Sequence, residues 1–363
     1  MADGVTKLRV VVWGTGNAGR PAIRAVAAHA DLELVGVVVS NPAKVGRDAG
    51  ELAFVEPLGV LATDDTGVAL ASDVDAVVYT ATADTRPDEA FADLVACLES
   101  GANVVSTSFY PLLHPASAPA PVTEVIERAC ATGDSSVFVS GIDPGWALDI
   151  LPILVSGVSA GIEEIRVQEI FNYALYDAPD VVREVIGFGG PMDQTPLMLL
   201  DIGLEMVWAP MVRILAEALD LELEDIRIHV ERRALERTIE VDGMGTFDEG
   251  TQGAFRFEVQ GIVDGRPLLV MEHVTRIDDD CAPDWPSSTQ PGGIHRVRIT
   301  GHPNLDVTIH GTEPGEPGAA GGGNATAANR IVNAIPAVCA APAGPVSPLD
   351  LPPITGARQI VRQ

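Results

Sequence analysis

The sequence predicts an α/β fold in which an N-terminal, doubly wound parallel sheet precedes an α+β domain. Three observations support this prediction. Short apolar runs alternate with helical patterns from residue 8 to about residue 140, which is typical of βαβ units. A glycine-rich turn at 14–19 separates the first apolar run from the first helical pattern. Beyond residue 160 the pattern changes to strands joined by hairpin signals, which indicates an antiparallel or mixed sheet.

In the first part, each predicted strand is a continuous apolar run, as expected for strands that are buried on both faces of a parallel sheet. The run at 8–13, LRVVVW, is rich in β-branched residues. The helical patterns place apolar residues three and four positions apart, for example at Phe91, Leu94 and Leu98. We predict strands at 8–13, 32–39, 76–79, 103–105 and 137–140, with helices after residue 19, around 91–98 and around 122–131.

The second part is predicted to begin with a strand at 162–171 and a long helix at 196–219, in which Pro210 is expected to start a second segment. The turn Asp264-Gly265-Arg266-Pro267 predicts a hairpin. Further predicted elements are strands at 226–241, 253–263, 268–277, 294–300 and 305–310, a loop at 313–323, a helix at 324–338 and a proline-rich tail at 342–356.

The composition excludes several classes of protein. The chain has 363 residues, with 23 basic and 51 acidic side chains and a net charge of −28. This charge argues against partners made of nucleic acid or anionic membrane, because both need clustered Lys and Arg. No apolar run approaches the length of a membrane span, and the N-terminus lacks the pattern of a signal peptide, so we expect a cytoplasmic protein. The four cysteines have no metal-ligand spacing, and no metal site is predicted.

The turn Gly14-Thr15-Gly16-Asn17-Ala18-Gly19 fits the G-x-G-x-x-G pattern between a strand and a helix. Gly14 allows the tight turn, Gly16 lets the backbone approach a pyrophosphate, and Gly19 allows close packing of the helix on the strand. The free N–H groups at the helix N-terminus favour the bound phosphates. The turn therefore predicts a Rossmann-type dinucleotide site to which all six residues contribute.

The end of the second predicted strand bears on the choice of dinucleotide. An Asp or Glu usually stands there when the ribose carries a free 2′-hydroxyl. Here the position is taken by Ser40, followed by Asn41, with Lys44 and Arg47 close behind. Because no acid is present to repel a 2′-phosphate, the sequence favours NADP, with NAD as the alternative.

Small hydroxyl residues follow two further predicted strands, at the carboxyl ends where ligands of such sheets bind. They are Thr80 and Thr82 after 76–79, and Ser106 and Thr107 after 103–105. Two later residues are further candidates for cofactor contact. They are Asp143, for which a helix N-cap is the alternative, and Asn333 on the last predicted helix.

Several segments together resemble one family. They are GTGNAG, KVGRDAGEL at 44–52, GANVVSTSFYPLLHP at 101–115, GIDPGWALDILP at 141–152 and ATAANRIVNAIPAVCAAPAG at 325–344. The chain is similar over most of its length to the dihydrodipicolinate-reductase-like group that holds native amine dehydrogenases and 2,4-diaminopentanoate dehydrogenase. The resemblance implies reductive amination of a ketone or aldehyde with NAD(P)H, the reverse oxidation of amines, and a homodimer built through the second-domain sheet.

The chain departs from this family pattern in two places. The His-His-x-x-Lys stretch of dihydrodipicolinate reductases is replaced by a segment around 169–179 without histidine or lysine, which argues against the reaction of lysine biosynthesis. The glutamate that the amine dehydrogenases are expected to place after the strand at 103–105 is also absent, because Ser108, Phe109 and Tyr110 stand there. The group that handles the ammonia proton must then lie elsewhere.

Glu169 is the leading candidate for that group. Strand alternation places it on an apolar face with Val167 and Phe171, where burial would raise the pKa of its carboxyl. The alternative is a structural glutamate in a salt bridge. Tyr110 and Tyr173 offer phenols as further catalytic candidates, and His114 is an alternative in the same loop as Tyr110. The predicted substrate pocket is apolar and comprises Phe109, Trp146, Phe171 and Tyr176.

These observations predict an NAD(P)-dependent oxidoreductase acting on a small, mainly apolar ketone, aldehyde or amine. A carbonyl or imine reductase and a non-catalytic NAD(P)-binding regulatory protein remain alternatives. The predicted domains are a dinucleotide-binding domain at 1–145, an α+β substrate and dimerisation domain at 146–323, and a helix and tail at 324–363 that return to the first domain.

Overall fold

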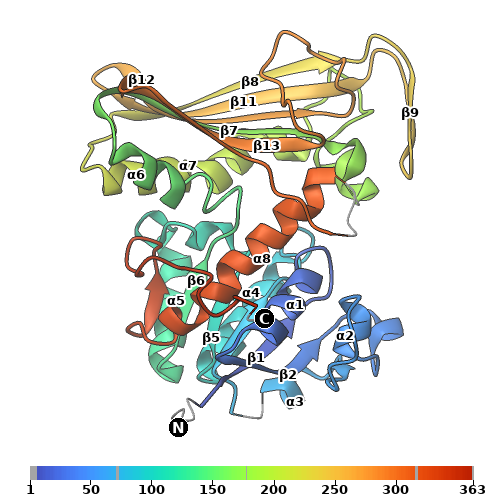
Figure 1. Ribbon diagram of the computed structural model, residues 1–363, viewed down its shortest axis with the longest axis vertical. Helices are drawn as coiled ribbons and strands as arrows, with labels where there is room; N and C mark the ends of the chain where they lie inside the picture. The colour runs from blue at the N-terminus through green and yellow to red at the C-terminus, as the bar shows by residue number, and fades with distance from the viewer. Residues whose placement is uncertain (1–5, 71–72, 177, 315–317, 362–363) are drawn as a thin grey trace. The chain divides into compact units, whose positions relative to one another are not determined.

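The computed structural model describes residues 6–70, 73–176, 178–314 and 318–361 (Figure 1). The chain forms two compact units. Unit 1 comprises residues 1–141 and 324–363, and unit 2 comprises residues 142–323. Among the described residues, no helix is both long enough and apolar enough to cross a bilayer.

Unit 1 is built on a seven-stranded sheet with the strand order β15-β6-β5-β4-β1-β2-β3. All of its strand pairs are parallel. The strand order reverses between β1 and β4, which makes the fold a doubly wound Rossmann sheet and confirms the predicted fold class. The strands are β1 (Leu8–Trp13), β2 (Leu32–Val38), β3 (Ala62–Thr63), β4 (Ala76–Tyr79), β5 (Asn103–Ser106), β6 (Ser136–Val139) and β15 (Gly344–Val346).

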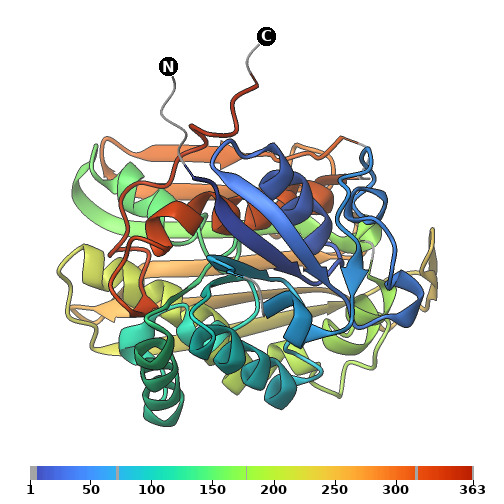
Figure 2. The same ribbon diagram turned by 90° about the horizontal axis from the view of Figure 1, so that it is seen from below.

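The helices of unit 1 cover both faces of this sheet, as Figure 2 shows. Val10 and Val12 of β1 share one apolar core with Ile23 of α1 and with Ile331 and Ile335 of α8. On the other side α4 and α5 pack against each other. The helices are α1 (Gly19–Ala28), α2 (Ala49–Leu52), α3 (Thr66–Leu70), α4 (Pro87–Glu99), α5 (Ala120–Gly133) and the part of α8 (Gly318–Val338) from residue 324 onward.

Unit 2 is an α+β unit, as predicted. Its six-stranded sheet has the order β14-β13-β7-β12-β11-β8. Only the pair β7 and β12 is parallel among the described strands of this sheet. The strands are β7 (Ala160–Asn172), β8 (Asp225–Ala234), β11 (Gln252–Val263), β12 (Arg266–Arg276), β13 (Gly293–His302) and β14 (Leu305–Ile309). Helix α7 (Asp201–Ala218) packs on β11 and β12, and α6 (Ile150–Ser156) lies against β7 and β13.

The predicted break at Pro210 is wrong, because α7 continues through this residue from Asp201 to Ala218. The predicted first turn is separate, as a short 3-10 helix at Leu197–Leu199. A proline removes one backbone hydrogen bond from a helix. Here Trp208 and Met211, on either side of Pro210, are buried, so packing against the sheet holds the helix together across the lost bond.

The predicted single strand at 226–241 is also wrong. Strand β8 ends at Ala234, and the chain leaves the sheet to form a separate hairpin of β9 (Ile239–Val241) and β10 (Gly245–Phe247). Gly243 and Gly245 of this hairpin have positive φ angles of 74° and 79°, which the sequence pattern of a continuous strand does not reveal.

Two predictions near the C-terminus need correction. The predicted loop at 313–323 is partly helical, because α8 begins at Gly318. At Gly322 an added Cβ would lie 2.2 Å from the carbonyl oxygen of Gly311, so glycine permits a close approach of the helix to the preceding segment. In addition, the predicted tail contains β15, which pairs with β6. Pro345 is tolerated there because β15 is the edge strand.

Candidate active site and cofactor turn

The glycine turn joins β1 to α1 at the point where the strand order of unit 1 reverses. Gly14 has a φ of +106°, and a Cβ at Gly19 would lie 2.2 Å from the carbonyl oxygen of Gly14. Both positions therefore require glycine. At Gly16, by contrast, an added Cβ would meet nothing within 4 Å. This open space next to the turn fits the pyrophosphate of a dinucleotide, for which Thr15, Asn17 and Ala18 supply further backbone.

The hydroxyl residues after β4 and β5 divide into two kinds. Thr80 Oγ1 donates to the Trp13 carbonyl at 3.1 Å, and Ser106 Oγ donates to the Tyr79 carbonyl at 2.8 Å. Ser106 is fully buried, so its hydroxyl joins β5 to β4. Thr82 is exposed and Thr107 is half-buried, which leaves these two side chains accessible at the carboxyl ends of the strands.

Lys44 reaches the glycine turn from the loop after β2. Its Nζ donates to the carbonyl oxygen of Thr15 at 3.1 Å and to Thr15 Oγ1 at 2.9 Å. Burial, together with the positive charges of Arg20 and Arg47, lowers the pKa of Lys44. Three cationic groups therefore gather beside the turn, where an anion would relieve their mutual repulsion.

The remaining predicted cofactor residues of unit 1 have simple placements. Ser40 is exposed at the end of β2, and Asn41 caps the short 3-10 helix Pro42–Lys44 by accepting from the backbone N–H of Ala43 at 2.9 Å. Asn333 lies on α8, where its Oδ1 accepts from Gln359 Nε2 at 3.3 Å.

In unit 2, four strands place polar and aromatic side chains in one row across the sheet. Phe257 of β11 pairs with His273 of β12, which pairs with Glu169 of β7, which pairs with His295 of β13. Glu169, His273 and His295 are 6%, 3% and 5% exposed. Since side chains directly opposite in neighbouring strands point to the same face, the row forms a buried acid–imidazole cluster.

Glu169 lies at the centre of this cluster. Its Oε1 accepts from the Tyr173 hydroxyl at 3.1 Å, and its Oε2 lies 3.3 Å from His295 Nε2. The carboxyl of Asp143 is hydrogen-bonded to that of Glu169. Asp143 Oδ1 in turn accepts from the indole Nε1 of Trp208 on α7 at 2.7 Å. A hydrogen bond between two carboxyl groups requires a proton on one of them, so Asp143 and Glu169 share one.

The pKa shifts in the cluster follow from burial. Burial raises the pKa of Glu169 to about 7, against hydrogen bonds from Tyr173 and Asp143 that lower it. Burial and the Glu169 charge hold the pKa of Asp143 well above its usual range. Burial lowers the pKa of His273 to about 3 and also lowers that of His295. Near neutral pH, Glu169 is therefore the group that exchanges a proton, while the imidazoles are neutral.

His273 has an unusual environment for a buried imidazole. Its ring stacks on Phe257 at a centroid distance of 4.9 Å and an angle of 12°. Its Nε2 comes within 3.4 Å of Glu169 Oε1, but neither ring nitrogen has a hydrogen-bond partner among the described residues. Leaving a buried polar group unsatisfied costs about 1–3 kcal/mol of folding free energy. The packing of the ring does not by itself explain why a histidine is buried here at that cost.

The structure brings some of the other predicted site residues to this cluster. Phe171 lies 5.1 Å from the His295 ring, and Tyr176 lies edge-on to Tyr173 at 5.0 Å. Trp146 is half-buried in the segment before α6. In unit 1, Tyr110 begins the short 3-10 helix Tyr110–Leu112, and Phe109 packs on Tyr79 at 5.0 Å.

The alternative role of Asp143 as a helix N-cap is wrong. The N-cap of α6 is Asp149, whose carboxylate accepts from the backbone N–H of Ile150. The side chain of Asp143 is instead engaged by Trp208 and Glu169. His114, the alternative in the loop of Tyr110, is satisfied locally, with its Nδ1 at 2.8 Å from Ser117 Oγ.

Sequence reasoning missed His273, His295 and Trp208. A signal for His273 was present, because Glu272 and His273 interrupt the otherwise apolar run LLVMEHV of a predicted strand. Polar residues inside a central strand are buried and need a reason. Nothing comparable marked His295, which only the register of β13 with β7 brings to Glu169.

A dinucleotide turn at the switch point of a doubly wound sheet, together with a unit that holds a buried acid–base cluster, defines an NAD(P)-dependent oxidoreductase. Comparison with known proteins gives the family. Residues 8–109 match the family model described as dihydrodipicolinate reductase, N-terminus, and residues 146–363 match the 2,4-diaminopentanoate dehydrogenase C-terminal domain. Over 311 residues the chain is 53% identical to an amine dehydrogenase of Streptomyces virginiae, covering 85% of this chain and 86% of that one. The chain therefore belongs to the dihydrodipicolinate-reductase-like family of amine dehydrogenases and 2,4-diaminopentanoate dehydrogenases, as its motifs indicated.

Solved structures share the fold. An amine dehydrogenase from Mycobacterium smegmatis has a TM-score of 0.76 at 21% identity, with 98% of this chain and 99% of that chain covered. An enzyme of gentamicin A biosynthesis, solved in complex with NAD, has a TM-score of 0.53 at 17% identity, with coverages of 92% and 88%. At these identities the likeness concerns the fold.

Proposed function

We propose that this protein catalyses the reversible reductive amination of a small, mainly apolar ketone or aldehyde with NAD(P)H. In balanced form, the carbonyl compound, an ammonium ion and NAD(P)H give the neutral amine, NAD(P)⁺ and water. The observation that carries the proposal is the buried carboxyl of Glu169, whose pKa is raised to about 7 among Tyr173, Asp143 and two neutral imidazoles. Membership of the amine dehydrogenase family supports it.

The bound nicotinamide supplies the hydride, and the protein supplies binding and proton transfer. Glu169 takes a proton from the ammonium ion. One N–H bond breaks, the proton passes to a carboxylate oxygen, and nitrogen keeps the electron pair with which it attacks the carbonyl carbon. Tyr173 holds the carboxylate through its 3.1 Å hydrogen bond. Tyr110 is a further candidate for proton transfer, at the position where the family glutamate is missing.

The proposed substrate is apolar because the candidate pocket residues are aromatic. The candidate residues of unit 2 are Trp146, Phe171 and Tyr176, and Phe109 is the candidate in unit 1. Arg166, on the same strand as Glu169, points to the opposite face, where its guanidinium binds Glu258 and Glu272 at 2.7 Å each. It is therefore committed to these partners and does not offer a clamp for a substrate carboxylate.

The direct test is spectrophotometric. Purified protein is mixed with NADPH or NADH and a panel of small ketones and aldehydes, with and without high ammonium at constant ionic strength. Oxidation that requires ammonium is the expected result. Oxidation without ammonium would identify a carbonyl reductase instead, and cofactor binding without turnover of any substrate would favour a regulatory protein.

The activity is expected to depend on pH through Glu169. Since this carboxyl must be ionised to accept a proton and its pKa is raised to about 7, kcat/KM for ammonium should fall as pH drops through 7. Half of this kcat/KM should already be lost at about pH 7, whereas an ordinary carboxylate would titrate near pH 4.3. The measurement is a pH profile of kcat/KM, with cofactor affinity determined at the same pH values. An acid limb below pH 5 would contradict the assignment.

We further propose that NADP is the preferred cofactor, with Ser40, Asn41 and Lys44 around the 2′-phosphate. The three cationic groups beside the turn support this. Lys44→Ala is expected to raise the Kd for NADPH by about 10-fold or more, since a charge-assisted hydrogen bond contributes about 1.5–3 kcal/mol, and to leave the Kd for NADH within about twofold. Lys7→Ala, at an exposed lysine, is the control. An equal loss for both cofactors would assign Lys44 to the turn itself.

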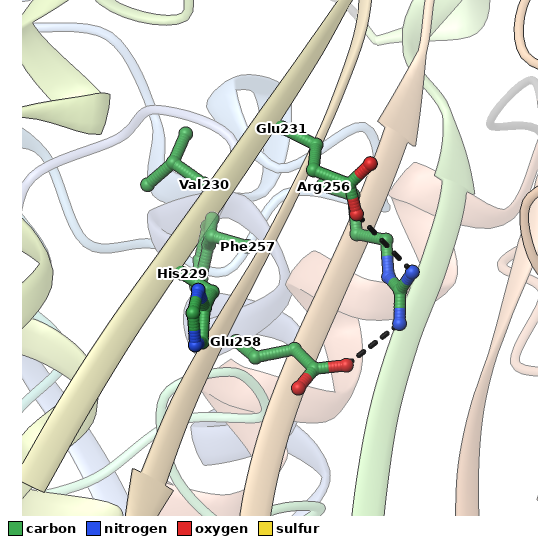
Figure 3. A pocket seen from close by; sticks show the side chains of 6 residues that line it. All are labelled: His229, Val230, Glu231, Arg256, Phe257 and Glu258. Carbon is green, nitrogen blue, oxygen red and sulfur yellow. Dashed lines mark hydrogen bonds and ion pairs between the residues drawn. The ribbon is translucent and has the colours of Figure 1, made fainter.

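We also propose a homodimer through the open face of the unit 2 sheet. On this face Arg256 binds Glu231, Glu258 and Glu272. Arg256 also lines a pocket with His229, and Figure 3 shows this pocket with the contacts of Arg256 to Glu231 and Glu258. Glu272 in this network is 1% exposed, and paired charges of both signs suit a surface that meets its own copy. Light scattering should give a dimer, and Arg256→Glu should raise its dissociation constant at least 10-fold, whereas Arg128→Glu on α5 should not. A wild-type monomer would refute this.

The cytoplasm remains the proposed compartment. All four cysteines are free, and Cys97, Cys130 and Cys281 are buried, which suits a reducing environment.

A further inference from the structure

Three acceptor groups of unit 2 converge on one point. Asp143, Glu169 and His273 each offer one oxygen or nitrogen atom, and these atoms all lie within 4.8 Å of one another. They come from the segment after β6, from β7 and from β12, so the sheet register and the loop together create the arrangement. Three groups this close can converge on one small ligand, and the two nearest atoms named, His273 Nε2 and Glu169 Oε1, are 3.4 Å apart.

His273 is the independent sign that something polar belongs there. The side chain is 97% buried, since only 3% is exposed, and both ring nitrogens lack a hydrogen-bond partner among the described residues. Stacking on Phe257 and Phe255, at angles of 12° and 13°, fixes the plane of the ring. The edge with Nε2 points to Glu169, 3.4 Å away. A neutral imidazole held in this way presents an acceptor to a ligand with N–H groups.

The charge and accessibility of the three groups favour a small monovalent cation. Because Asp143 and Glu169 share a proton, the pair carries one negative charge, which matches one positive charge better than two. Asp143 and Tyr173 are half-buried, whereas Glu169 and His273 are buried. The indole of Trp208 lies edge-on to the His273 ring, with 5.6 Å between the ring centroids.

We propose that Asp143, Glu169 and His273 form the ammonium-binding site, in which the nitrogen donates one hydrogen bond to each carboxyl and one to the imidazole. This inference rests on the proposed function, because reductive amination is what makes ammonium a substrate. Glu169 then receives the proton of its own hydrogen bond: this N–H bond breaks, its electron pair stays on nitrogen, and the ammonia that remains is held by its hydrogen bonds to Asp143 and His273. Asp143 and His273 are binding residues for nitrogen, and the carbonyl substrate does not depend on them.

The test separates the two substrates. His273→Phe keeps an aromatic ring in the stack but removes both nitrogens, and Asp143→Asn keeps an acceptor for Trp208. Both variants should raise the KM for ammonium at least 10-fold, while the KM for the ketone and the Kd for NADPH change less than twofold. His302→Phe, at an exposed histidine of β13, should match the wild type. His273→Gln, which restores a polar acceptor, should recover part of the ammonium affinity.

A second measurement does not depend on turnover. In the absence of cofactor, ammonium chloride should raise the melting temperature of the wild type above that in sodium chloride of equal ionic strength, and the difference should vanish in His273→Phe. If the variant does not fold, Asp143→Asn carries the same test. Equal changes in the KM of ammonium and ketone would overturn the site, as would a stoichiometric divalent metal in the purified wild type. If the wild type turns over without ammonium, the proposed function itself fails instead.

Discussion

Replacing Glu169 with glutamine is expected to lower ammonium-dependent kcat/KM by about 10²–10⁴-fold, the usual contribution of a positioned acid–base group. Glutamine keeps the size of the side chain and can still accept from the Tyr173 hydroxyl, but it cannot take up a proton. The Kd for NADPH should change less than twofold. The matched control is Glu163→Gln, at an exposed position of the same strand, which should leave the activity unchanged.

The same variant decides between a catalytic and a structural glutamate. The pKa of Glu169 is raised in the folded protein to about 7, so the folded state binds this proton more tightly than the unfolded chain does. Its ionised form therefore destabilises the fold progressively as pH rises from about 4.5 to 7 and above. Because glutamine resembles the protonated form, Glu169→Gln should melt at the same or a higher temperature at pH 8, and the difference should shrink near pH 4. A lower melting temperature at pH 8 would indicate a structural ion pair instead.

A methyl group added at Gly16 is expected to raise the Kd for NADPH and NADH at least 10-fold and leave stability unchanged. An alanine Cβ at this position meets nothing within 4 Å in the protein, and the backbone needs no positive φ. The space it takes is the one assigned to the pyrophosphate, where backbone must approach closely. Isothermal titration with both cofactors and a melting curve measure the two effects.

Two neighbouring comparisons sharpen this prediction. Gly356→Ala adds a methyl group in equally open space in the C-terminal tail and should affect neither quantity. Gly19→Ala places its Cβ 2.2 Å from the Gly14 carbonyl and should reduce both stability and binding. If Gly16→Ala binds both cofactors like the wild type, the pyrophosphate does not lie against this turn.

The alternation of polar and apolar residues was sufficient to place Glu169 on the buried face of its strand, because that inference needs only the period of a strand. It could not find His273 or His295, which lie far along the chain from Glu169. Only the pairing of β12 and β13 with β7 brings them to it, and strand order in a mixed sheet is a tertiary property. The glycine turn was predictable for the opposite reason, since all of its requirements are local.

The errors in the fold predicted from the sequence have a common physical origin. The sequence at Pro210 and at 318–323 carries helix-breaking residues, and local propensity therefore argued for a break and a loop. In the structure, burial on both sides of Pro210 and the close approach at Gly322 outweigh that propensity. Strand β15 escaped notice because an edge strand of three residues, one of them proline, has no periodicity to detect.

The return of residues 324–363 to unit 1 has a consequence for biosynthesis. Ile331, Ile335 and Val338 of α8 belong to the same apolar core as Val10 and Val12, and β15 covers the edge of β6. During translation the ribosome must add roughly 180 residues of unit 2 before these pieces emerge, which takes about 10–40 s at ordinary elongation rates. The second unit, being continuous, can mature first, while the earlier-made half waits with an uncovered hydrophobic face and a bare strand edge. Chaperone demand should therefore concentrate on the nascent N-terminal half, and a message truncated after residue 323 should yield aggregates and no isolated nucleotide-binding module.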